Sequence, residues 1–343
     1  PIIGITGTNG KTTTKELIAA VLKKKYKTLY TQGNLNNHIG VPLTLLRLEE
    51  GHEIAIVEMG ANHPGEIKTL VDIVEPNYGI ITNVGKAHIE GFGSFEGVIK
   101  TKCELYDFLE KNGGAAFVNK GNDLLLAKTT KIEKVIEYGN GSEFSATIEN
   151  NNPFLVLKWD DSTINTNLIG NYNAENIMAS VAIGHSFKVD KKDIIDALTE
   201  FKGLPAHIEG YIPQNNRSQF KETAHNKLII DAYNANPTSM NAAIDNFNLI
   251  EETGKIVILG DMKELGAISE IEHQKIIDKL ENCNIEKVIV VGCEFKKTKS
   301  NHAIKLENVN ELIAYLDNEI IKNKLILIKG SNSMKLIECI NHL

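Results

Sequence analysis

Cysteine is scarce in this chain, and no two of its four copies have the CxxC spacing of metal-binding or redox pairs. The four residues are Cys103, Cys283, Cys293 and Cys339. Such scattered cysteines fit neither a zinc knuckle nor a disulfide framework, and they favour a reducing compartment. The sequence therefore predicts a cytoplasmic protein whose stability does not depend on crosslinks.

A surplus of positive charge is also lacking, because 37 Lys and Arg residues stand against 44 Asp and Glu residues, for a net charge of −7. Proteins that bind a phosphate backbone carry an excess of basic residues, so this balance argues against a nucleic-acid partner. No apolar run approaches the ~20 residues that cross a bilayer, and no basic-then-apolar leader is present. We therefore expect no membrane partner. At about 150 residues per domain, a chain of this length predicts two domains.

Apolar runs rich in Ile and Val alternate with helical patterns in the first part of the chain. These runs are continuous, which is typical of strands covered on both faces, and their alternation with helices predicts βαβ units around a mostly parallel sheet. Residues 133–168 instead alternate polar with apolar residues and predict antiparallel strands. The other predicted strands are 1–6, 53–58, 78–82 and 115–119, and the predicted helices are 12–25, 65–74, 95–110, 173–186 and 191–201.

A break follows at residues 202–205, where Gly203 and Pro205 end the preceding helix. A second α/β alternation comes after it. Its predicted strands are 227–232, 255–260, 287–292 and 325–329, and they follow a polar stretch at 214–226. We predict an α/β protein in which a domain with a P-loop-type, mostly parallel central sheet (1–203) is followed by a smaller Rossmann-like α/β domain (204–343).

A glycine-rich turn, Gly7-Thr-Asn-Gly-Lys-Thr-Thr13, joins the first predicted strand to the first predicted helix. Backbone N–H groups in such a turn, with the helix dipole behind them, bind phosphate oxygens. Lys11 can neutralise phosphate charge and the Thr12 hydroxyl can ligate Mg²⁺. The strict G-x-x-x-x-G-K-[ST] spacing is not met, because Ile5 occupies the first glycine position, and a glycine turn capped by threonines is the structural alternative. The predicted nucleotide-binding residues are Gly7, Thr8, Asn9, Gly10, Lys11, Thr12 and Thr13.

Glu58 ends an apolar strand, so we expect its carboxylate at the carboxyl edge of the sheet, where ligands collect in open α/β folds. Mg²⁺ binds through few carboxylates together with phosphates and water, so Glu58 and Thr12 beside ATP form a sufficient set. His88 follows the next strand and would reach the same crevice. Imidazole is an unusual ligand for Mg²⁺, and a hydrogen-bonded polar residue is the simpler interpretation of a lone histidine.

Three further polar residues lie on predicted helices of the first domain. Lys102 lies on the helix 95–110, where a solvated or ion-paired lysine is the usual outcome. Asn173 and Asn176 open a later helix one turn apart. An amide can pair with the N6/N7 edge of adenine, so a contact with the base is one interpretation, and an asparagine helix cap is the other.

In the second predicted domain, Asp231 ends the first strand, where it could meet the ATP ribose or its metal shell. Asn236-Pro237 suits the cap and first position of a helix, so a purely structural role is open for this pair. Residues 329–334 are expected to start the final helix, whose free N–H groups could bind a carboxylate. An ordinary helix start is the alternative.

Taken together, several segments resemble the Mur ligase superfamily of amide ligases, and in particular its MurF type, the UDP-N-acetylmuramoyl-tripeptide–D-alanyl-D-alanine ligases. The resemblance spans nearly the whole chain and is weak over 120–165 and 295–320. The segments that carry it are Thr6-Gly-Thr-Asn-Gly-Lys-Thr12, Asn34-Leu-Asn-Asn-His-Ile-Gly-Val-Pro42, Asp231-Ala-Tyr-Asn-Ala-Asn-Pro237, Gly260-Asp-Met-Lys-Glu-Leu-Gly266 and Lys329-Gly-Ser-Asn-Ser-Met334.

This resemblance implies an enzyme of cytoplasmic peptidoglycan precursor synthesis, which we expect to be a monomer. With ATP and Mg²⁺ it would convert UDP-N-acetylmuramoyl-tripeptide to an acyl phosphate, which D-Ala-D-Ala then attacks, and ADP and phosphate would be released. Another Mur-type or folylpolyglutamate-type ligase is one alternative. A non-catalytic nucleotide-gated binding module is the other.

The resemblance also implies roles for individual residues. The expected catalytic residues are Lys11, Glu58, His88 and Lys102, and the expected metal ligands are Thr12, Glu58, His88 and Lys102. Lys102 would carry a CO₂-derived carbamate, which converts its cation into an anionic ligand. Asn173, Asn176 and Asp231 complete the expected nucleotide contacts. The expected substrate contacts are Asn34, Asn36, Asn37, Tyr233, Asn234, Lys329 and Ser331, with turn chemistry as the alternative for the three asparagines of the 34–42 segment.

The chain departs from the family pattern at a few positions. Tyr172 stands where a histidine is usual and His207 where an arginine is usual, and Arg217 could take over the missing charge. The N-terminal UDP-binding domain of the family has no counterpart in this sequence. We therefore expect a domain fragment that binds ATP and turns over poorly, because binding energy from the UDP end would be missing.

Overall fold

The computed structural model describes residues 1–202 and 219–343, which form two compact units. Unit 1 comprises residues 1–85, 91–167 and 171–202, and unit 2 comprises residues 86–90, 168–170 and 219–343. The predicted boundary between residues 203 and 204 lies outside the described residues, as do His207 and Arg217, so these predictions stay untested. None of the described helices is both long enough and apolar enough to span a membrane.

Unit 1 is built on a six-stranded sheet in the order β2-β3-β1-β4-β5-β6, in which every neighbouring pair is parallel. Its strands are β1 (Ile2–Thr6), β2 (Thr28–Tyr30), β3 (Ile54–Glu58), β4 (Tyr78–Ile81), β5 (Ala115–Asn119) and β6 (Lys134–Tyr138). Because β1 lies between β3 and β4, the carboxyl ends of these three strands are adjacent. The register pairs Ile5 with Glu58 and Thr6 with Ile81.

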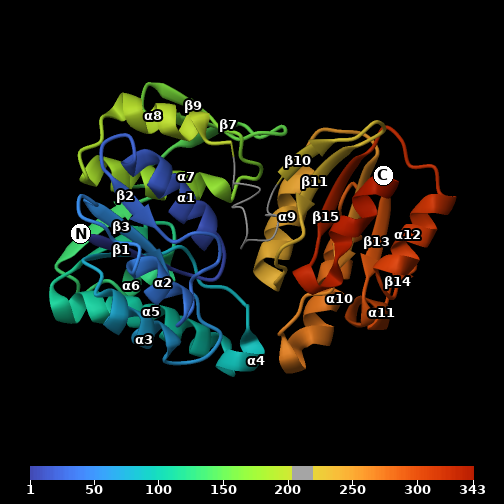
Figure 1. Ribbon diagram of the computed structural model, residues 1–343. Helices are drawn as coiled ribbons and strands as arrows, with labels where there is room; N and C mark the ends of the chain where they lie inside the picture. The colour runs from blue at the N-terminus through green and yellow to red at the C-terminus, as the bar shows by residue number, and fades with distance from the viewer. Residues whose placement is uncertain (203–218) are drawn as a thin grey trace. The chain divides into compact units, whose positions relative to one another are not determined.

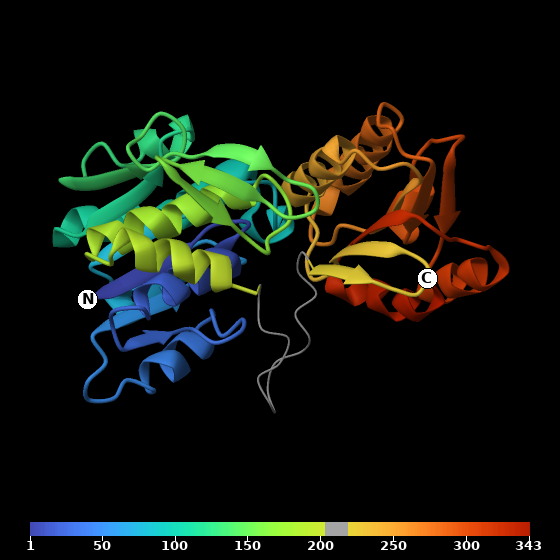
Figure 2. The same cartoon turned by 90° about the horizontal axis from the view of Figure 1, so that it is seen from above.

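Helices cover both faces of this sheet, as Figures 1 and 2 show. On one face α1 packs against α7 and α8, and on the other α3 packs against α5. All five residues of β3 are buried, which explains why the central strands are continuous apolar runs. The helices up to residue 202 are α1 (Lys11–Leu22), α2 (Gly40–Leu45), α3 (Glu66–Val74), α4 (Ile89–Phe92), α5 (Phe95–Asn112), α6 (Asp123–Ala127), α7 (Asn173–Ser186) and α8 (Lys191–Glu200).

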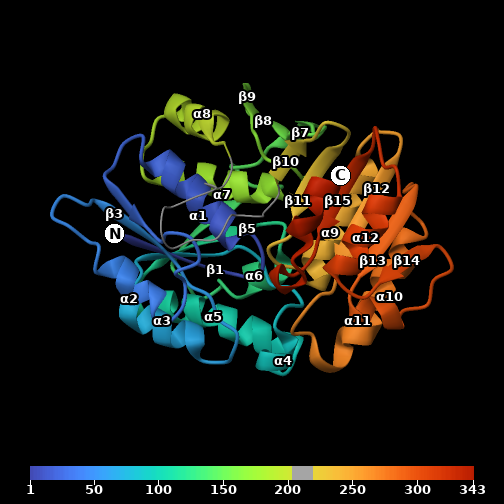
Figure 3. The same ribbon diagram turned by 45° about the vertical axis from the view of Figure 1, so that its right-hand side comes forward.

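The prediction of antiparallel strands over 133–168 is partly wrong. The three-stranded sheet of β7 (Thr147–Asn150), β8 (Val156–Trp159) and β9 (Ser162–Asn165) is antiparallel, as predicted, and is labelled in Figure 3. β6, however, pairs in parallel with β5 at the edge of the large sheet. An edge strand is exposed on one side, so β6 has the mixed polar and apolar sequence that suggested a hairpin.

Unit 2 contains a second six-stranded sheet, in the order β10-β11-β15-β12-β13-β14. Only β10 runs antiparallel to its neighbour. The strands are β10 (Gln219–Glu222), β11 (Lys227–Asp231), β12 (Lys255–Gly260), β13 (Lys287–Val291), β14 (Ala303–Leu306) and β15 (Leu325–Lys329). The α/β architecture is therefore as predicted, while β10 was not predicted, because it lies in a polar stretch of the sequence.

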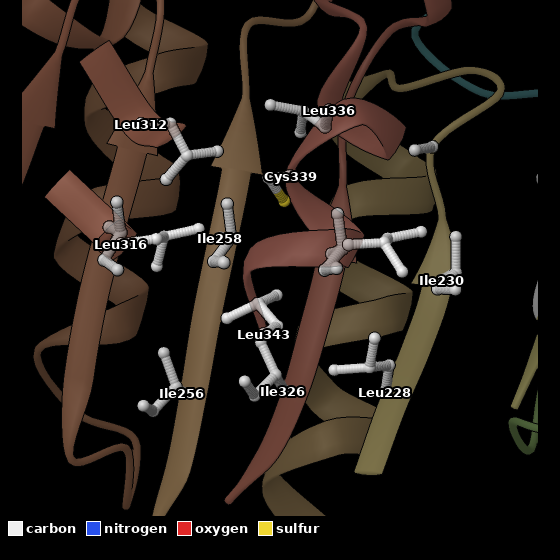
Figure 4. Packing of buried hydrophobic residues seen from close by; sticks show 14 of the residues in the cluster. Leu228, Ile230, Ile256, Ile258, Leu312, Leu316, Ile326, Leu336, Cys339 and Leu343 are labelled. Atoms are coloured by element: carbon white, nitrogen blue, oxygen red, sulfur yellow. The ribbon is translucent and has the colours of Figure 1, made fainter. Parts of the chain in front are cut away.

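The helices of unit 2 lie on both faces of its sheet (Figure 1). The α-helices are α9 (Pro237–Leu249), α10 (Ser269–Leu280), α11 (Cys293–Lys297) and α12 (Val309–Asn318). The 3₁₀ segments are η1 (Gly266–Ile268), η2 (Asn332–Met334) and η3 (Leu336–His342). On one face, strand side chains pack against α12 and the chain after β15 (Figure 4). The residues labelled there are Leu228, Ile230, Ile256, Ile258, Ile326, Leu312, Leu316, Leu336, Cys339 and Leu343.

Replacing Ile258 by alanine should lower the free energy of unfolding by about 2–5 kcal/mol, because the change removes a fully buried side chain and leaves a cavity. Ile320→Ala is the matched control, since the same atoms are removed from a side chain that is 86 % exposed. We expect this control to change the free energy by less than about 0.5 kcal/mol. Denaturant unfolding followed by circular dichroism measures both variants, and equal effects would contradict the described core of unit 2.

Candidate functional site

The glycine-rich turn between β1 and α1 has a backbone that only glycine fits. Gly7 has φ +143° and Gly10 has φ +78°. A Cβ on residue 7 would lie 2.0 Å from Oγ1 of Thr82, and a Cβ on residue 10 would lie 2.8 Å from Oδ1 of Asn176. The two glycines therefore let the turn approach the segment after β4 and the start of α7 more closely than any side chain permits.

The segment after β4 fixes the turn from the other side. The backbone N–H of Thr8 donates to the carbonyl oxygen of Asn83 at 2.9 Å, and that of Asn9 donates to Oδ1 of Asn83, also at 2.9 Å. Thr82 Oγ1 donates to the carbonyl oxygen of Asn9 at 2.7 Å. Several hydrogen bonds thus hold the turn in one conformation, which is what a preformed phosphate cradle requires.

Lys11 begins α1, and Thr12 and Thr13 follow it in the first helical turn. The Nζ of Lys11 donates to the carbonyl oxygens of Gly7 at 2.8 Å and Thr8 at 3.0 Å. Its ammonium therefore lies over the concave side of the turn. A phosphate bound by the turn would meet this cation directly.

Glu58, at the end of β3, is 1 % exposed and faces the first turn of α1. Its Oε1 accepts hydrogen bonds from Thr12 Oγ1 at 3.2 Å and from Asn36 Nδ2 at 2.8 Å. Its backbone N–H donates to Oγ1 of Thr31 at 3.0 Å. Oε2 of Glu58 is buried and accepts no hydrogen bond from any described residue. A buried carboxylate oxygen without a donor is costly to a fold, and it suits a cation ligand.

Thr12 and Glu58 fit a Mg²⁺ site that is completed by phosphates and water. Within residues 1–202 and 219–343, no group of three His, Cys, Asp or Glu side chains could hold a metal ion by itself. His88 belongs to the segment 86–90 of unit 2, where its Nδ1 pairs with the carboxylate of Glu264. That contact agrees with the hydrogen-bonded interpretation, and the predicted approach of His88 to Glu58 is not tested.

Lys102 is not the solvated lysine that a helical position usually provides, because its side chain on α5 is 2 % exposed. Nζ donates to the carbonyl oxygen of Ala61 at 3.3 Å and lies 5.4 Å from the centre of the Phe92 ring. Burial, and to a lesser degree the charge of Lys11, lowers the pKa of Lys102 to about 7. A substantial fraction of this lysine is therefore a neutral, nucleophilic amine near neutral pH.

The two asparagines of α7 lie against the turn. Asn176 Oδ1 accepts from Thr14 Oγ1 at 3.0 Å, and its Nδ2 donates to Asn173 Oδ1 at 2.8 Å. Both side chains are buried. These contacts place Asn176 behind Gly10 as a support of the turn, and the predicted contact with adenine stays a prediction.

The three asparagines of the segment that follows β2, Asn34, Asn36 and Asn37, make different contacts. Asn37 Oδ1 accepts the backbone N–H groups of Ile39 and Gly40 at 3.1 and 2.9 Å, which is the turn chemistry of the alternative interpretation. Asn34 contributes a carbonyl oxygen that accepts the N–H of Asn36 at 2.7 Å. Asn36 reaches Glu58 with its side chain, whose Nδ2 donates to the carboxylate.

In unit 2, hydrogen bonds link the carboxyl ends of β11 and β15. Lys329 Nζ donates to Asp231 Oδ2 at 2.5 Å and to the carbonyl oxygen of Asn234 at 3.2 Å. The carbonyl oxygen of Tyr233 accepts the N–H of Asn332 at 3.1 Å. The structure thus brings Lys329 to the segment of Asp231, Tyr233 and Asn234, from which it is almost a hundred residues distant in the sequence. Asn236 caps α9 in a capping box with Ser239, so its structural interpretation is confirmed.

The predicted final helix after residue 329 is wrong. The chain instead forms the short 3₁₀ segments η2 and η3, separated by Lys335 in the left-handed conformation with φ +53°. Hence there is no α-helix N-terminus here to bind a carboxylate. Ser331 uses its Oγ to accept the N–H of Lys263 at 3.2 Å.

Sequence reasoning missed Lys15, which also lies beside Glu58. A weak signal was available, because Lys15 lies one helical turn after Lys11 and Thr12 and so shares their side of α1. It missed Thr31 as well, since β2 has only three residues and no recognisable pattern.

Two family models match the chain. The model of the Mur ligase middle domain matches residues 5–184, and that of the Mur ligase glutamate ligase domain matches residues 216–332. The first covers the turn, Glu58 and Lys102, and the second covers Asp231 and Lys329. Together they account for most of the chain.

The chain is 33 % identical to the UDP-N-acetylmuramoyl-tripeptide–D-alanyl-D-alanine ligase of Bacillus subtilis, over 100 % of this chain and 75 % of that protein. Among solved structures it is similar to MurF from Acinetobacter baumannii, with a TM-score of 0.88 and 30 % identity over 99 % of this chain and 75 % of that one. It is also similar to the MurF ligase from Thermotoga maritima in complex with ADP, with a TM-score of 0.84 and 26 % identity over 99 % of this chain and 78 % of that one. These similarities confirm the predicted resemblance.

Gly7→Ala should weaken nucleotide binding by about tenfold or more, because the new Cβ would lie 2.0 Å from Thr82 Oγ1 and would force the turn out of its shape. Gly65→Ala is the matched control. It also has a positive φ, +82°, but no atom lies within 4 Å of the added Cβ. Titration calorimetry with ADP measures both variants, and wild-type affinity in Gly7→Ala would contradict the assignment of the turn.

Proposed function

This chain belongs to the Mur ligase family, and we propose that it is an ATP-dependent amide ligase of the MurF type, which joins D-Ala-D-Ala to UDP-N-acetylmuramoyl-tripeptide in peptidoglycan precursor synthesis. The observation that carries this proposal is the buried Glu58 carboxylate. It accepts a hydrogen bond from Thr12, which follows the glycine turn and Lys11 in α1. The MurF relative in complex with ADP supports the nucleotide site. The relatives at about 33 % identity support the choice of substrates.

The reaction proceeds in two steps. The terminal carboxylate of the tripeptide attacks the γ-phosphorus of ATP, the bond to the bridging oxygen breaks, and ADP leaves an acyl phosphate behind. The amine of D-Ala-D-Ala then attacks the acyl carbon and loses a proton, and phosphate departs from the tetrahedral intermediate. Lys11 exchanges its contacts with Gly7 and Thr8 for the γ-phosphate oxygens, where it stabilises the charge that is transferred.

The proposed metal is Mg²⁺, which supplies charge neutralisation at the phosphates when it is bound. Thr12 and Glu58 would hold it, because a hydroxyl and a buried carboxylate with an unbonded oxygen are hard oxygen ligands. His88 and a carbamylated Lys102 complete the proposed set. An unmodified lysine ammonium would repel the cation, so the role of Lys102 depends on the carbamate.

Several features of the Lys102 environment favour carbamylation. The side chain is enclosed, its neighbours include the apolar Phe92 ring, and its pKa is lowered to about 7 by burial. A carbamate forms when the neutral amine attacks CO₂ and a proton is released. The environment therefore supplies the reactive form at a pH where an ordinary lysine is almost fully protonated.

In unit 2 the proposal assigns nucleotide contact to Asp231 and substrate contact to Tyr233, Asn234, Lys329 and Ser331. The Lys329–Asp231 pair at 2.5 Å is partly enclosed, so each side chain orients the other at the ends of β15 and β11. The Asp231 carboxylate can accept a hydrogen bond from a sugar hydroxyl, and the Lys329 cation can pair with a carboxylate. The pair therefore suits a ligand that has both groups. The predicted cytoplasmic location is part of the same proposal.

A non-catalytic nucleotide-gated binding module is the competing function. It would need the turn and Lys11, but it would have no use for the buried Glu58 carboxylate with its open oxygen, or for Lys102, a buried lysine of lowered pKa. Release of phosphate from ATP that depends on both UDP-N-acetylmuramoyl-tripeptide and D-Ala-D-Ala separates the two. Release dependent on other acceptors would instead indicate another Mur-type or folylpolyglutamate-type ligase.

Lys11→Ala should lower the rate of this phosphate release by about 10²–10³-fold, because it removes the cation that faces the transferred phosphate. Lys192→Ala removes an exposed lysine from α8 and should leave the rate unchanged. Thermal unfolding confirms that both variants are folded. Full activity in Lys11→Ala would show that the turn does not bind the reacting phosphates.

Incubation with ¹³C-bicarbonate should give a carbamate signal in the carbon NMR spectrum of the protein, and Lys102→Ala should abolish it. The signal should grow as the pH rises through about 7, because only the deprotonated amine reacts, and it should be lost below that pH as the ammonium form takes over. Lys100→Ala, an exposed lysine on the same helix, is the control that keeps the signal. Lys102→Arg cannot form the carbamate and should be inactive, so a fully active Lys102→Arg would defeat the hypothesis.

A further inference from the structure

Lys15 is a lysine with no exposed side-chain surface, on α1 one turn after the residues that face the phosphate. Lysine is almost never fully buried without a partner, because removing its charge from water is costly. The proposed reaction gives this residue no task. Its burial beside Glu58 therefore needs an explanation of its own.

The ammonium of Lys15 lies between two carboxylates. Nζ is 3.1 Å from Oε1 of Glu16 and 3.8 Å from Oε2 of Glu58. It also donates a hydrogen bond of 3.2 Å to the carbonyl oxygen of Gly33, which precedes the asparagine segment. Glu16 and Gly33 thus anchor the ammonium, and Glu58 lies just beyond hydrogen-bond distance.

The two oxygens of Glu58 are held in different ways. Oε1 accepts hydrogen bonds from Thr12 and Asn36, whereas Oε2 accepts none from the described residues. Lys15 is the one cation within 4 Å of Oε2 among the ion pairs of the described chain. At 3.8 Å it attracts the oxygen through a medium of low polarity without occupying the lone pairs. The carboxylate is therefore oriented at both ends while one oxygen stays available.

We propose that Lys15 is a positioning residue that fixes the Glu58 carboxylate beside Thr12 and thereby sets the affinity of the nucleotide site for Mg²⁺. This inference rests on the proposed function, because it presupposes that nucleotide and Mg²⁺ bind at the turn. A carboxylate free to rotate would have to be ordered again each time the ion binds. Lys15 removes that cost before binding, as partners of metal ligands generally do.

A charge-matched variant separates positioning from simple neutralisation. Lys15, Glu16 and Glu58 carry a net charge of −1 as one cation and two anions. Lys15→Met combined with Glu16→Gln removes one charge of each sign, so Glu58 alone leaves the same net charge. The matched control is Lys24→Met combined with Glu200→Gln, which removes an ion pair of 2.7 Å from the surface of the same unit.

The experiment is calorimetric titration with ADP at a series of Mg²⁺ concentrations and in the absence of Mg²⁺. We expect the Lys15→Met/Glu16→Gln protein to need about tenfold more Mg²⁺ for half-maximal enhancement of ADP binding. Its affinity for ADP without metal should equal that of the wild type, because the turn and Lys11 are unchanged. The Lys24→Met/Glu200→Gln control should behave as the wild type in both respects.

A wild-type Mg²⁺ requirement in the folded Lys15→Met/Glu16→Gln protein would overturn the proposal. Thermal unfolding establishes whether the variant is folded. If it is not, Lys15→Gln/Glu16→Gln keeps the same net charge and retains a donor for Gly33, and the same two outcomes apply to it. Failure of the wild-type protein to bind ADP at any Mg²⁺ concentration would instead refute the proposed function.

Discussion

The buried carboxylate of Glu58 is the point on which the geometry of unit 1 depends. Burying a carboxylate is costly unless donors and cations surround it, so its neighbours must be fixed in place. Thr12 of α1 and Asn36 of the loop after β2 donate hydrogen bonds to the carboxylate, and Thr31, which follows β2, accepts the backbone N–H of Glu58. Glu58 thus fixes the relation between the phosphate-facing helix and the asparagine segment through its side chain, and it is tied to the edge strand through its backbone.

The order of the strands makes this meeting possible. β3 lies directly beside β1, with Ile5 paired to Glu58, so the last residue of one strand is level with the start of the turn that follows the other. On the opposite side β4 continues into Thr82 and Asn83, which hold the turn by hydrogen bonds. Gly7 is essential at this point, because the Thr82 hydroxyl occupies the space of any Cβ. The turn is therefore shaped by tertiary contacts as much as by its own sequence.

The central strands could be predicted from the sequence because a parallel strand covered on both faces must be apolar throughout, as Ile54–Glu58 is up to its last residue. Each of two such apolar strands also pointed to a site residue at its carboxyl end, the glycine-rich turn after the first strand and Glu58 at the end of another. The pairing of β6 could not be predicted, since its residues alternate and its partner β5 is known only from the fold. Lys15 was missed although it lies one helical turn after Lys11, because lysine is ordinarily exposed. The final helix was wrongly predicted because Lys335 has a left-handed backbone conformation, which stops a helix that the local sequence favours.

Hydrogen-bond saturation distinguishes the motif residues that serve the fold from those that can serve a ligand. Asp261, in the Gly260–Gly266 segment, has both carboxylate oxygens bonded to backbone N–H groups of α11, from Glu294 at 3.1 Å and Phe295 at 3.0 Å. Asn236 closes the capping box of α9. Binding a ligand through either would require breaking contacts that hold an element in place. Glu58 differs, because its Oε2 is enclosed and oriented but accepts no hydrogen bond from the described chain. A family motif is therefore not by itself a site, and the residue whose bonding capacity the fold leaves unused is the one best suited to chemistry.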